Sequence, residues 1–121
     1  MNGNDIVIVS ATRTAIGKFG GQFATTSAIE LGTAVAKSAI QKAKLSPEQI
    51  DTVIFGNVLQ AGLGQNPARQ VGLKAGLLHS STALTVNEVC GSGLKAIILA
   101  AQSLRLGDAK IVLAGGMENM S

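Results

Sequence analysis

The sequence predicts an α/β fold in which a mostly parallel sheet carries helices on both faces. Short apolar runs rich in Val and Ile, such as residues 6–11 and 52–56, alternate with longer segments of helical periodicity, which is typical of βαβ units. The chain has three Phe and no Trp or Tyr, so its core has to be built from Val, Ile, Leu and Ala, the residues that suit a buried parallel sheet. Because crossovers between parallel strands are right-handed, helices are expected on both faces of the sheet.

Length and composition indicate a single domain. The chain has 121 residues, of which 46% are hydrophobic and 14% charged, and this composition supports a packed core. We find no internal repeat, linker or low-complexity segment in it. Residues 1–121 are therefore treated as one domain. No further element follows the last expected strand at residues 110–116, so we expect this domain to be partial.

The first half of the chain contains a strand, a loop and a helix. Residues 6–11 form a nearly continuous apolar run and are expected to be a buried strand. The glycine-rich residues 17–21 are expected to form a loop. Ser27 and Glu30 fit a capping box, in which each side chain binds a free backbone N–H at the start of a helix. That helix is expected to end near Lys44 after about four turns, with an apolar face made of Leu31, Ala34, Val35, Ala39 and Ile40.

The second half continues the alternation. Pro47 is expected at the first position of a short helical turn, because its ring presets the backbone for a helix and the N–H that it lacks is not needed there. The further elements expected are a strand at residues 52–56, a helix at 67–77, a strand at 83–87, a helix at 91–106 and a strand at 110–116. In the helix at 91–106, one side is formed by Leu94, Ile97, Ile98, Ala101 and Leu104.

Charge and cysteine content exclude several classes of protein. The ten Lys and Arg residues give a net charge of +3 but form no stripe and have no aromatic residues between them, so a nucleic-acid partner is not expected. No apolar run approaches the roughly 20 residues that span a bilayer. The amino terminus, residues 1–5, lacks the basic and apolar regions of a signal peptide, so no membrane partner is expected and a cytoplasmic location is predicted. A single cysteine excludes an intramolecular disulfide and a cysteine-based zinc site.

Cys90 is the candidate catalytic residue. It falls between the end of an expected strand and the start of an expected helix, where unpaired N–H groups and the helix dipole favour a thiolate. Gly91 and Gly93 let the backbone turn sharply and leave room for a substrate at the sulfur. In parallel sheets, sites are found at such junctions. A lone cysteine in an apolar sequence is also commonly a small core residue, and the residues alone leave this alternative open.

Several segments together resemble the thiolase family, and within it the acetyl-CoA acetyltransferase branch. The segment around Cys90, Val86-Asn87-x-x-Cys90-Gly91-Ser92-Gly93-Leu94, is similar to the acyl-enzyme signature of thiolases. Segments beginning at Ala11, Gly56, Gly64 and Ala114 are also similar to the family, in the same order and at the family's spacing, and the last reads Ala-Gly-Gly-Met-Glu-Asn-Met-Ser. The resemblance covers essentially the whole chain and identifies it as the partial amino-terminal domain of a thiolase-like fold.

The resemblance implies a reaction that proceeds through a thioester on Cys90. In thiolases this cysteine takes an acyl group from an acyl-CoA, and a second acyl-CoA attacks the thioester as a carbanion. Two acetyl-CoA then give acetoacetyl-CoA and CoA reversibly, with coenzyme A thioesters as substrates and no cofactor. The family's other catalytic motifs, Gly-His-Pro, Asn-Glu-Ala-Phe and Cys-x-Gly, are not found in these residues, and His79 matches none of them. The loop domain and the carboxy-terminal half of the family fold are also missing, so the chain by itself is predicted to be inactive.

The resemblance also implies a homo-oligomer, a dimer or tetramer. The expected strand at residues 83–87 corresponds to the one that pairs across the twofold axis of thiolase dimers. Gln65 and Asn66 are the candidate dimer contacts, in a glycine-containing segment that lacks the Gly-Lys-Ser/Thr ending of a phosphate loop. We interpret Glu88 as a solvated or structural residue and expect Arg69 to pair with a nearby acid.

The sequence leaves three alternative functions open. The first is a degradative 3-ketoacyl-CoA thiolase for longer chains, since the residues that set chain length in the family are not in this segment. The second is a non-catalytic assembly fragment in which Cys90 is buried and inert. The third, a nucleotide-binding domain, is disfavoured because the glycine fingerprint of such domains is missing.

Overall fold

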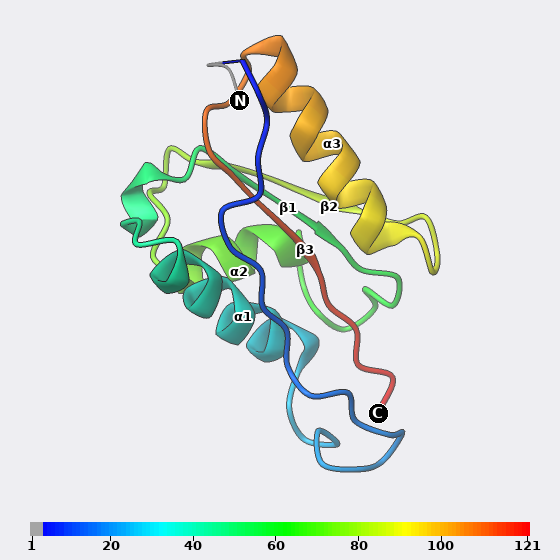
Figure 1. Ribbon diagram of the computed structural model, residues 1–121. Helices are drawn as coiled ribbons and strands as arrows, with labels where there is room; N and C mark the ends of the chain where they lie inside the picture. Colours follow the sequence, from blue (N-terminus) through cyan, green and yellow to red (C-terminus); the bar gives the residue numbers. More distant parts are fainter. Residues whose placement is uncertain (1–3) are drawn as a thin grey trace.

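The computed structural model describes residues 4–121 and shows three layers (Figure 1). The central layer is a parallel sheet of β1 (Thr52–Gly56), β2 (Thr82–Val86) and β3 (Val112–Gly116), in the order β2-β1-β3. α1 (Ala28–Lys42) and α2 (Pro67–Lys74) cover one face, and α3 (Ser92–Leu106) covers the other. A short 3₁₀ turn, η1 (Pro47–Gln49), precedes β1. The predicted α/β class, with a parallel sheet and helices on both faces, is confirmed. Residues 1–3 of the amino-terminal sequence discussed above lie outside the described residues.

The three strands begin and end level with one another. Thr52 pairs with Thr82 on one side and Val112 on the other, and Gly56 pairs with Val86 and Gly116. All strands run in the same direction, so their carboxyl ends form one edge of the sheet. The segments that follow β1, β2 and β3 all leave from this edge, and it is where ligands bind in open parallel sheets.

Two apolar clusters hold the layers together. Along β1, Val53 and Phe55 face α1 and α2, whereas Ile54 faces α3. All three side chains are at most 3% exposed, as expected for the central strand of a parallel sheet. The buried side chains of α3 that pack against Ile54 are the small ones of Ala96 and Ala100, and Leu99 packs beside them partly buried. This helix therefore lies close to the sheet.

The capping box of α1 is present as predicted. The Ser27 hydroxyl accepts a hydrogen bond from the Glu30 N–H at 3.0 Å, and the Glu30 carboxylate accepts one from the Ser27 N–H at 2.7 Å. The helix ends at Lys42, two residues before the predicted end, and its buried face differs from the predicted apolar stripe. The buried residues of α1 are Ala28, Ile29, Gly32, Ala36 and Ile40. Three of them are small, which lets the helix pack closely against its neighbours.

The bounds of the four later elements also differ from the prediction. β2 spans Thr82–Val86 rather than residues 83–87, and α3 begins at Ser92 rather than at residue 91. α2 ends at Lys74 rather than at residue 77, because Gly76 adopts a left-handed conformation (φ +98°) and the Leu77 N–H turns back to the Gly72 carbonyl. The strand predicted at residues 110–116 begins at Val112.

The predicted strand at residues 6–11 is wrong. This segment is in no strand, and Val7, Ile8 and Val9 are 48%, 77% and 66% exposed. It is attached to α1 through side chains, because the Ser10 hydroxyl donates to the Ala39 carbonyl at 2.7 Å. An apolar run becomes a strand only where a neighbouring strand supplies hydrogen-bond partners. Within residues 4–121, neither outer strand of the sheet pairs with it.

The outer face of α3 is apolar and largely uncovered. Leu94, Ile97 and Ile98 are 65%, 44% and 42% exposed, while Ser92, Ala96 and Ala100 form the buried face. By length and composition alone, Val89–Leu106 could cross a membrane, with a mean hydropathy of 1.2. By that measure, the expectation that no apolar run approaches the length of a membrane span is wrong for Val89–Leu106. In the structure it forms the loop of Cys90 and the helix that covers one face of the sheet.

Asp51 joins the starts of the three strands. Its substitution should lower the free energy of unfolding by an amount that depends on pH. Its carboxylate accepts hydrogen bonds from the N–H groups of Lys110 and Ile111 at 2.7 and 3.0 Å, which lower the pKa of Asp51. A lowered folded-state pKa gives stabilisation that is complete above the unfolded-state value and is lost as pH falls through the folded-state value. Asp51→Asn should therefore lower the free energy of unfolding by about 1 kcal/mol at pH 7 and by less at pH 3. Urea titrations at the two pH values measure this, and an equal loss at both would contradict it.

Candidate active site

Cys90 lies at the carboxyl edge of the sheet, between β2 and α3. Its side chain is exposed, and Gly91, the next residue, is the N-cap of α3. Cys90 lines a cleft of about 440 Å³ whose other walls come from the segments that follow β1 and β3. The burial assumed in the second alternative is wrong, because the Cys90 side chain is exposed and lines this cleft, whereas its role as a nucleophile stays a prediction.

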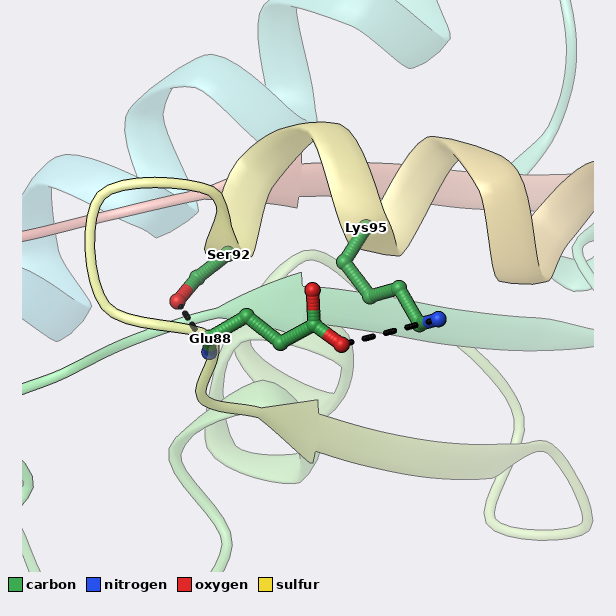
Figure 2. Close-up of polar contacts among 3 residues, drawn as sticks. All are labelled: Glu88, Ser92 and Lys95. Atoms are coloured by element: carbon green, nitrogen blue, oxygen red, sulfur yellow. Dashed lines mark hydrogen bonds and ion pairs between the residues drawn. The ribbon is translucent and has the colours of Figure 1, made fainter.

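The loop that carries Cys90 is held by Ser92. The Ser92 hydroxyl accepts a hydrogen bond from the Glu88 N–H at 2.8 Å, drawn in Figure 2, and donates one to the Val89 carbonyl at 2.7 Å. The Asn87 side chain accepts from the Val89 N–H at 2.9 Å. Sequence reasoning missed this role of Ser92. The available signal was a hydroxyl residue in the first turn of the helix, where such side chains bind free backbone groups.

These bonds hold Val89 in a left-handed conformation, with φ +52°. For a β-branched residue this conformation is strained, at a cost of about 1–2 kcal/mol. Because Val89 directly precedes Cys90, the strained turn determines where the thiol points.

Relieving this strain should stabilise the fold. Val89→Gly removes the side chain that is incompatible with φ > 0 and should raise the free energy of unfolding by about 1 kcal/mol. Val9→Gly is a matched control, because Val9 is 66% exposed, close to the 64% of Val89, but has a negative φ. The control should be neutral or slightly destabilising. Urea titration of both variants checks the difference, and equal changes would show that Val89 is unstrained.

Three glycines let the first turn of α3 rest directly on the sheet. A Cβ atom built on Gly56 of β1 would lie 2.4 Å from the carbonyl carbon of Ser92 and 2.7 Å from the nitrogen of Gly93. A Cβ on Gly116 of β3 would lie 3.3 Å from the Cα of Gly93. The start of α3 is therefore positioned by contact between backbones. Its free N–H groups and dipole, which stabilise negative charge, lie at the same edge as the thiol.

The Glu88 side chain forms an exposed ion pair and is not directed at Cys90's thiol chemistry in any contact of the described residues. Its carboxylate lies 3.5 Å from the Lys95 ammonium one turn into α3, and Figure 2 shows it directed toward that side chain. The two side chains are 55% and 36% exposed, so this ion pair contributes little to stability. The interpretation of Glu88 as solvated or structural agrees with this geometry.

Asn66 and Gln65 lie on an exposed turn before α2. The Asn66 side chain caps α2 by accepting from the Arg69 N–H at 3.2 Å, and it also binds β2, accepting from the Thr85 hydroxyl at 2.7 Å and donating to the Ala83 carbonyl at 3.2 Å. The Gln65 carbonyl accepts from the Gln70 side chain at 2.8 Å. Both residues lie beside the outer strand β2, and their contact with a second copy stays a prediction.

Arg69 does not pair with an acid, contrary to expectation. Its guanidinium donates to the carbonyl of Ser81 at 2.6 Å and to that of His79 at 2.9 Å. It thereby fixes the loop that leads into β2. His79 lies in this loop, exposed and away from the cleft-lining residues, as expected for a loop histidine. Among residues 4–121, no group of three His, Cys, Asp or Glu side chains is arranged to hold a metal ion.

Comparison with known proteins gives a consistent set of relatives. Residues 6–121 match the family described as "Thiolase, N-terminal domain". The chain is 62% identical over 115 residues to the acetyl-CoA acetyltransferase of Escherichia coli (strain K12), covering 95% of this chain and 29% of that protein. It is 56% identical over 116 residues to the cytosolic acetyl-CoA acetyltransferase of Mus musculus, covering 96% of this chain and 29% of that protein.

A solved structure shows the same arrangement. The Acat5 thiolase from Ascaris suum, crystallised in complex with coenzyme A, superposes with a TM-score of 0.89 at 45% identity, over 90% of this chain and 28% of that one. The chain spans about 30% of the length of the curated relatives it matches.

Proposed function

The chain belongs to the thiolase family, and from that premise we propose that it supplies the acyl-carrying cysteine of a thiolase-type acyltransferase. The observation that carries the proposal is the position of Cys90, whose exposed thiol lines a cleft at the start of α3. A nucleophile at such a position is reached by substrate and lies in the field of the helix dipole.

In the first half of the proposed reaction, the Cys90 thiolate attacks the carbonyl carbon of acetyl-CoA. A new C–S bond forms to Cys90, the C–S bond to coenzyme A breaks, and coenzyme A leaves as a thiolate that takes up a proton. The charge that develops on the carbonyl oxygen has to be stabilised. The N–H groups of Gly91 and Ser92 already donate to the carbonyls of Glu88 and Val89, so we expect the start of α3 to contribute through its helix dipole.

In the second half, the α-carbon of another acetyl-CoA loses a proton and forms a C–C bond to the carbonyl carbon of the thioester. The C–S bond to Cys90 breaks, and the Cys90 thiolate that leaves takes up a proton. The products are acetoacetyl-CoA and the free thiol, and each step can be reversed. Because the chain spans about 30% of its curated relatives, we assign to it the thioester step alone. The inactivity predicted for residues 1–121 by themselves therefore refers to the complete condensation.

We further propose a cytoplasmic protein that assembles as a homo-oligomer. Relatives from mouse and rat are named cytosolic, which supports the location. The outer strand β2 carries Leu84, which is 46% exposed, and among the described residues no strand pairs with its outer edge, where the Asn66 side chain donates to the Ala83 carbonyl. An exposed strand edge of this kind supports pairing with a second copy.

Transfer of an acetyl group to Cys90 tests the proposed function. The chain is incubated with acetyl-CoA, quenched in acid and analysed by intact mass and peptide mapping. We expect one acetyl group on the peptide that contains Cys90, released by hydroxylamine at neutral pH as a thioester is. Prior treatment with iodoacetamide should prevent the labelling. Acetylation confined to lysines, or none on Cys90, would refute the proposal.

A further inference from the structure

Glu118 makes a set of hydrogen bonds beside the Cys90 cleft that the thioester chemistry leaves unexplained. It follows β3 and is partly buried. One carboxylate oxygen accepts from the Val58 N–H at 2.9 Å, and the other accepts from the Leu59 N–H at 3.0 Å and from the Asn57 side chain at 3.2 Å. We call this group, Glu118 with Asn57, Val58 and Leu59, the Glu118 clasp.

The Glu118 clasp supplies hydrogen-bond acceptors to backbone N–H groups that lie beyond the end of β1. β1 ends at Gly56, so the N–H groups of Val58 and Leu59 cannot be bound by a neighbouring strand and need another acceptor. The Asn57 amide nitrogen also donates to the Met117 carbonyl at 3.0 Å. Both of its partners are acceptors, so the amide orientation is fixed by chemistry. A carboxylate is the side chain that can accept all three bonds, because it has no donor of its own at neutral pH.

The clasp builds one wall of the cleft. Val58 and Glu118 line the same cavity as Cys90, and Met120 lies two residues beyond Glu118 on the same lining. Gly56 and Gly116, which support the first turn of α3, directly precede the two segments that the clasp ties together. The position of this wall relative to the thiol therefore depends on the Glu118 carboxylate.

The loop of Cys90 is held independently. Its hydrogen bonds are made by Ser92 and Asn87, neither of which belongs to the clasp. Loss of the clasp should therefore leave the thiol itself unchanged and alter only the surface against which a bulky substrate is placed.

We propose that Glu118 is a positioning residue for acyl transfer, which fixes the cleft wall that contains Val58 and Glu118 itself and so places an acyl-CoA against Cys90. The inference rests on the proposed function. It gives the cleft wall that contains Val58 and Glu118 a role in orienting the thioester, and it assigns no proton transfer to Glu118.

The test compares two reagents of different size on the full chain. Glu118→Gln keeps the shape of the side chain but turns an N–H₂ donor toward a backbone N–H, and Glu118→Asp keeps the charge on a shorter side chain. Glu48→Gln, at an exposed carboxylate in η1, is the matched control. For each we measure the rate of Cys90 acetylation by acetyl-CoA, the rate of alkylation by iodoacetamide, and hydrogen exchange at Val58 and Leu59.

We expect Glu118→Gln to slow acetylation at least about tenfold, because a small misplacement of reacting groups has large effects on rate. Alkylation by iodoacetamide should change less than about twofold, exchange at Val58 and Leu59 should accelerate, and Glu118→Asp should recover part of the acetylation rate. Unchanged acetylation, or a parallel fall in acetylation and alkylation, would overturn the positioning role.

The outcome also separates this inference from the proposed function. If the unsubstituted chain is not acetylated on Cys90, the proposed function is wrong and the positioning role falls with it. Hydrogen exchange then tests separately whether Glu118 protects the N–H groups of Val58 and Leu59. Unchanged exchange at both residues in Glu118→Gln would show that the hydrogen bonds of the Glu118 clasp do not hold this segment.

Discussion

Replacing Gly56 with alanine is expected to remove both acetylation of Cys90 and a large part of the stability of the fold. The added methyl group would lie 2.4 Å from the Ser92 carbonyl carbon, and backbone cannot rotate away as a flexible side chain can. α3 would have to lift from β1, which should cost about 3 kcal/mol and would displace the loop of Cys90. Urea unfolding and the acetylation assay measure the two effects.

Gly93→Ala is the matched control for this prediction. Gly93 lies in the same contact, but a Cβ atom on it would meet nothing within 4 Å. Alanine is favoured over glycine inside a helix, so this variant should be as stable as the parent or more stable by up to about 1 kcal/mol. If both variants are destabilised equally, the approach of α3 to the sheet is looser than the structure shows.

Cys90→Ser is expected to reduce acetyl transfer at this position by at least about a thousandfold. A serine hydroxyl is a weak nucleophile without an adjacent general base, whereas a thiol supplies thiolate near neutral pH. The side chain is exposed and the two residues are similar in size, so stability should change by no more than about 0.5 kcal/mol. The assay is quenched-flow acetylation with mass analysis, accompanied by urea unfolding.

A second readout removes ambiguity from this prediction. Cys90 is the single cysteine of the chain, so iodoacetamide labelling of the unsubstituted protein counts the reactive thiol directly, and Cys90→Ser should show none. Acetyl transfer that persists at the parent rate in Cys90→Ser would place the acyl group elsewhere and end the assignment of Cys90 as nucleophile.

The sequence predicted those parts of the fold that depend on local patterns. The capping box at Ser27 and the bounds of β1 follow from neighbouring residues, and both were predicted as the structure has them. The run at residues 6–11 has the same local pattern as a strand but finds no partner among the described residues, and pairing is a property of distant segments. Its prediction failed for that reason.

The candidate site also has one part that local sequence patterns predict and another part that they do not. The position of Cys90 at a strand-to-helix junction could be predicted, because strand and helix signals adjoin at it. The clasp could not, because Glu118 meets Val58 across 60 residues of sequence and nothing near either residue indicates the other. The contact between Gly56 and Ser92 could not be predicted either, because a glycine at the end of a strand has several structural explanations.

The pairing of β1 with both outer strands also has a consequence for how the chain is made. On a ribosome, β1, α2 and β2 emerge before β3, so β1 can pair with β2 before β3 exists. The wall that carries Glu118 and Met120 is synthesised after every other part of the cleft. Cys90 is therefore synthesised before the segment that, in our proposal, orients a thioester against it.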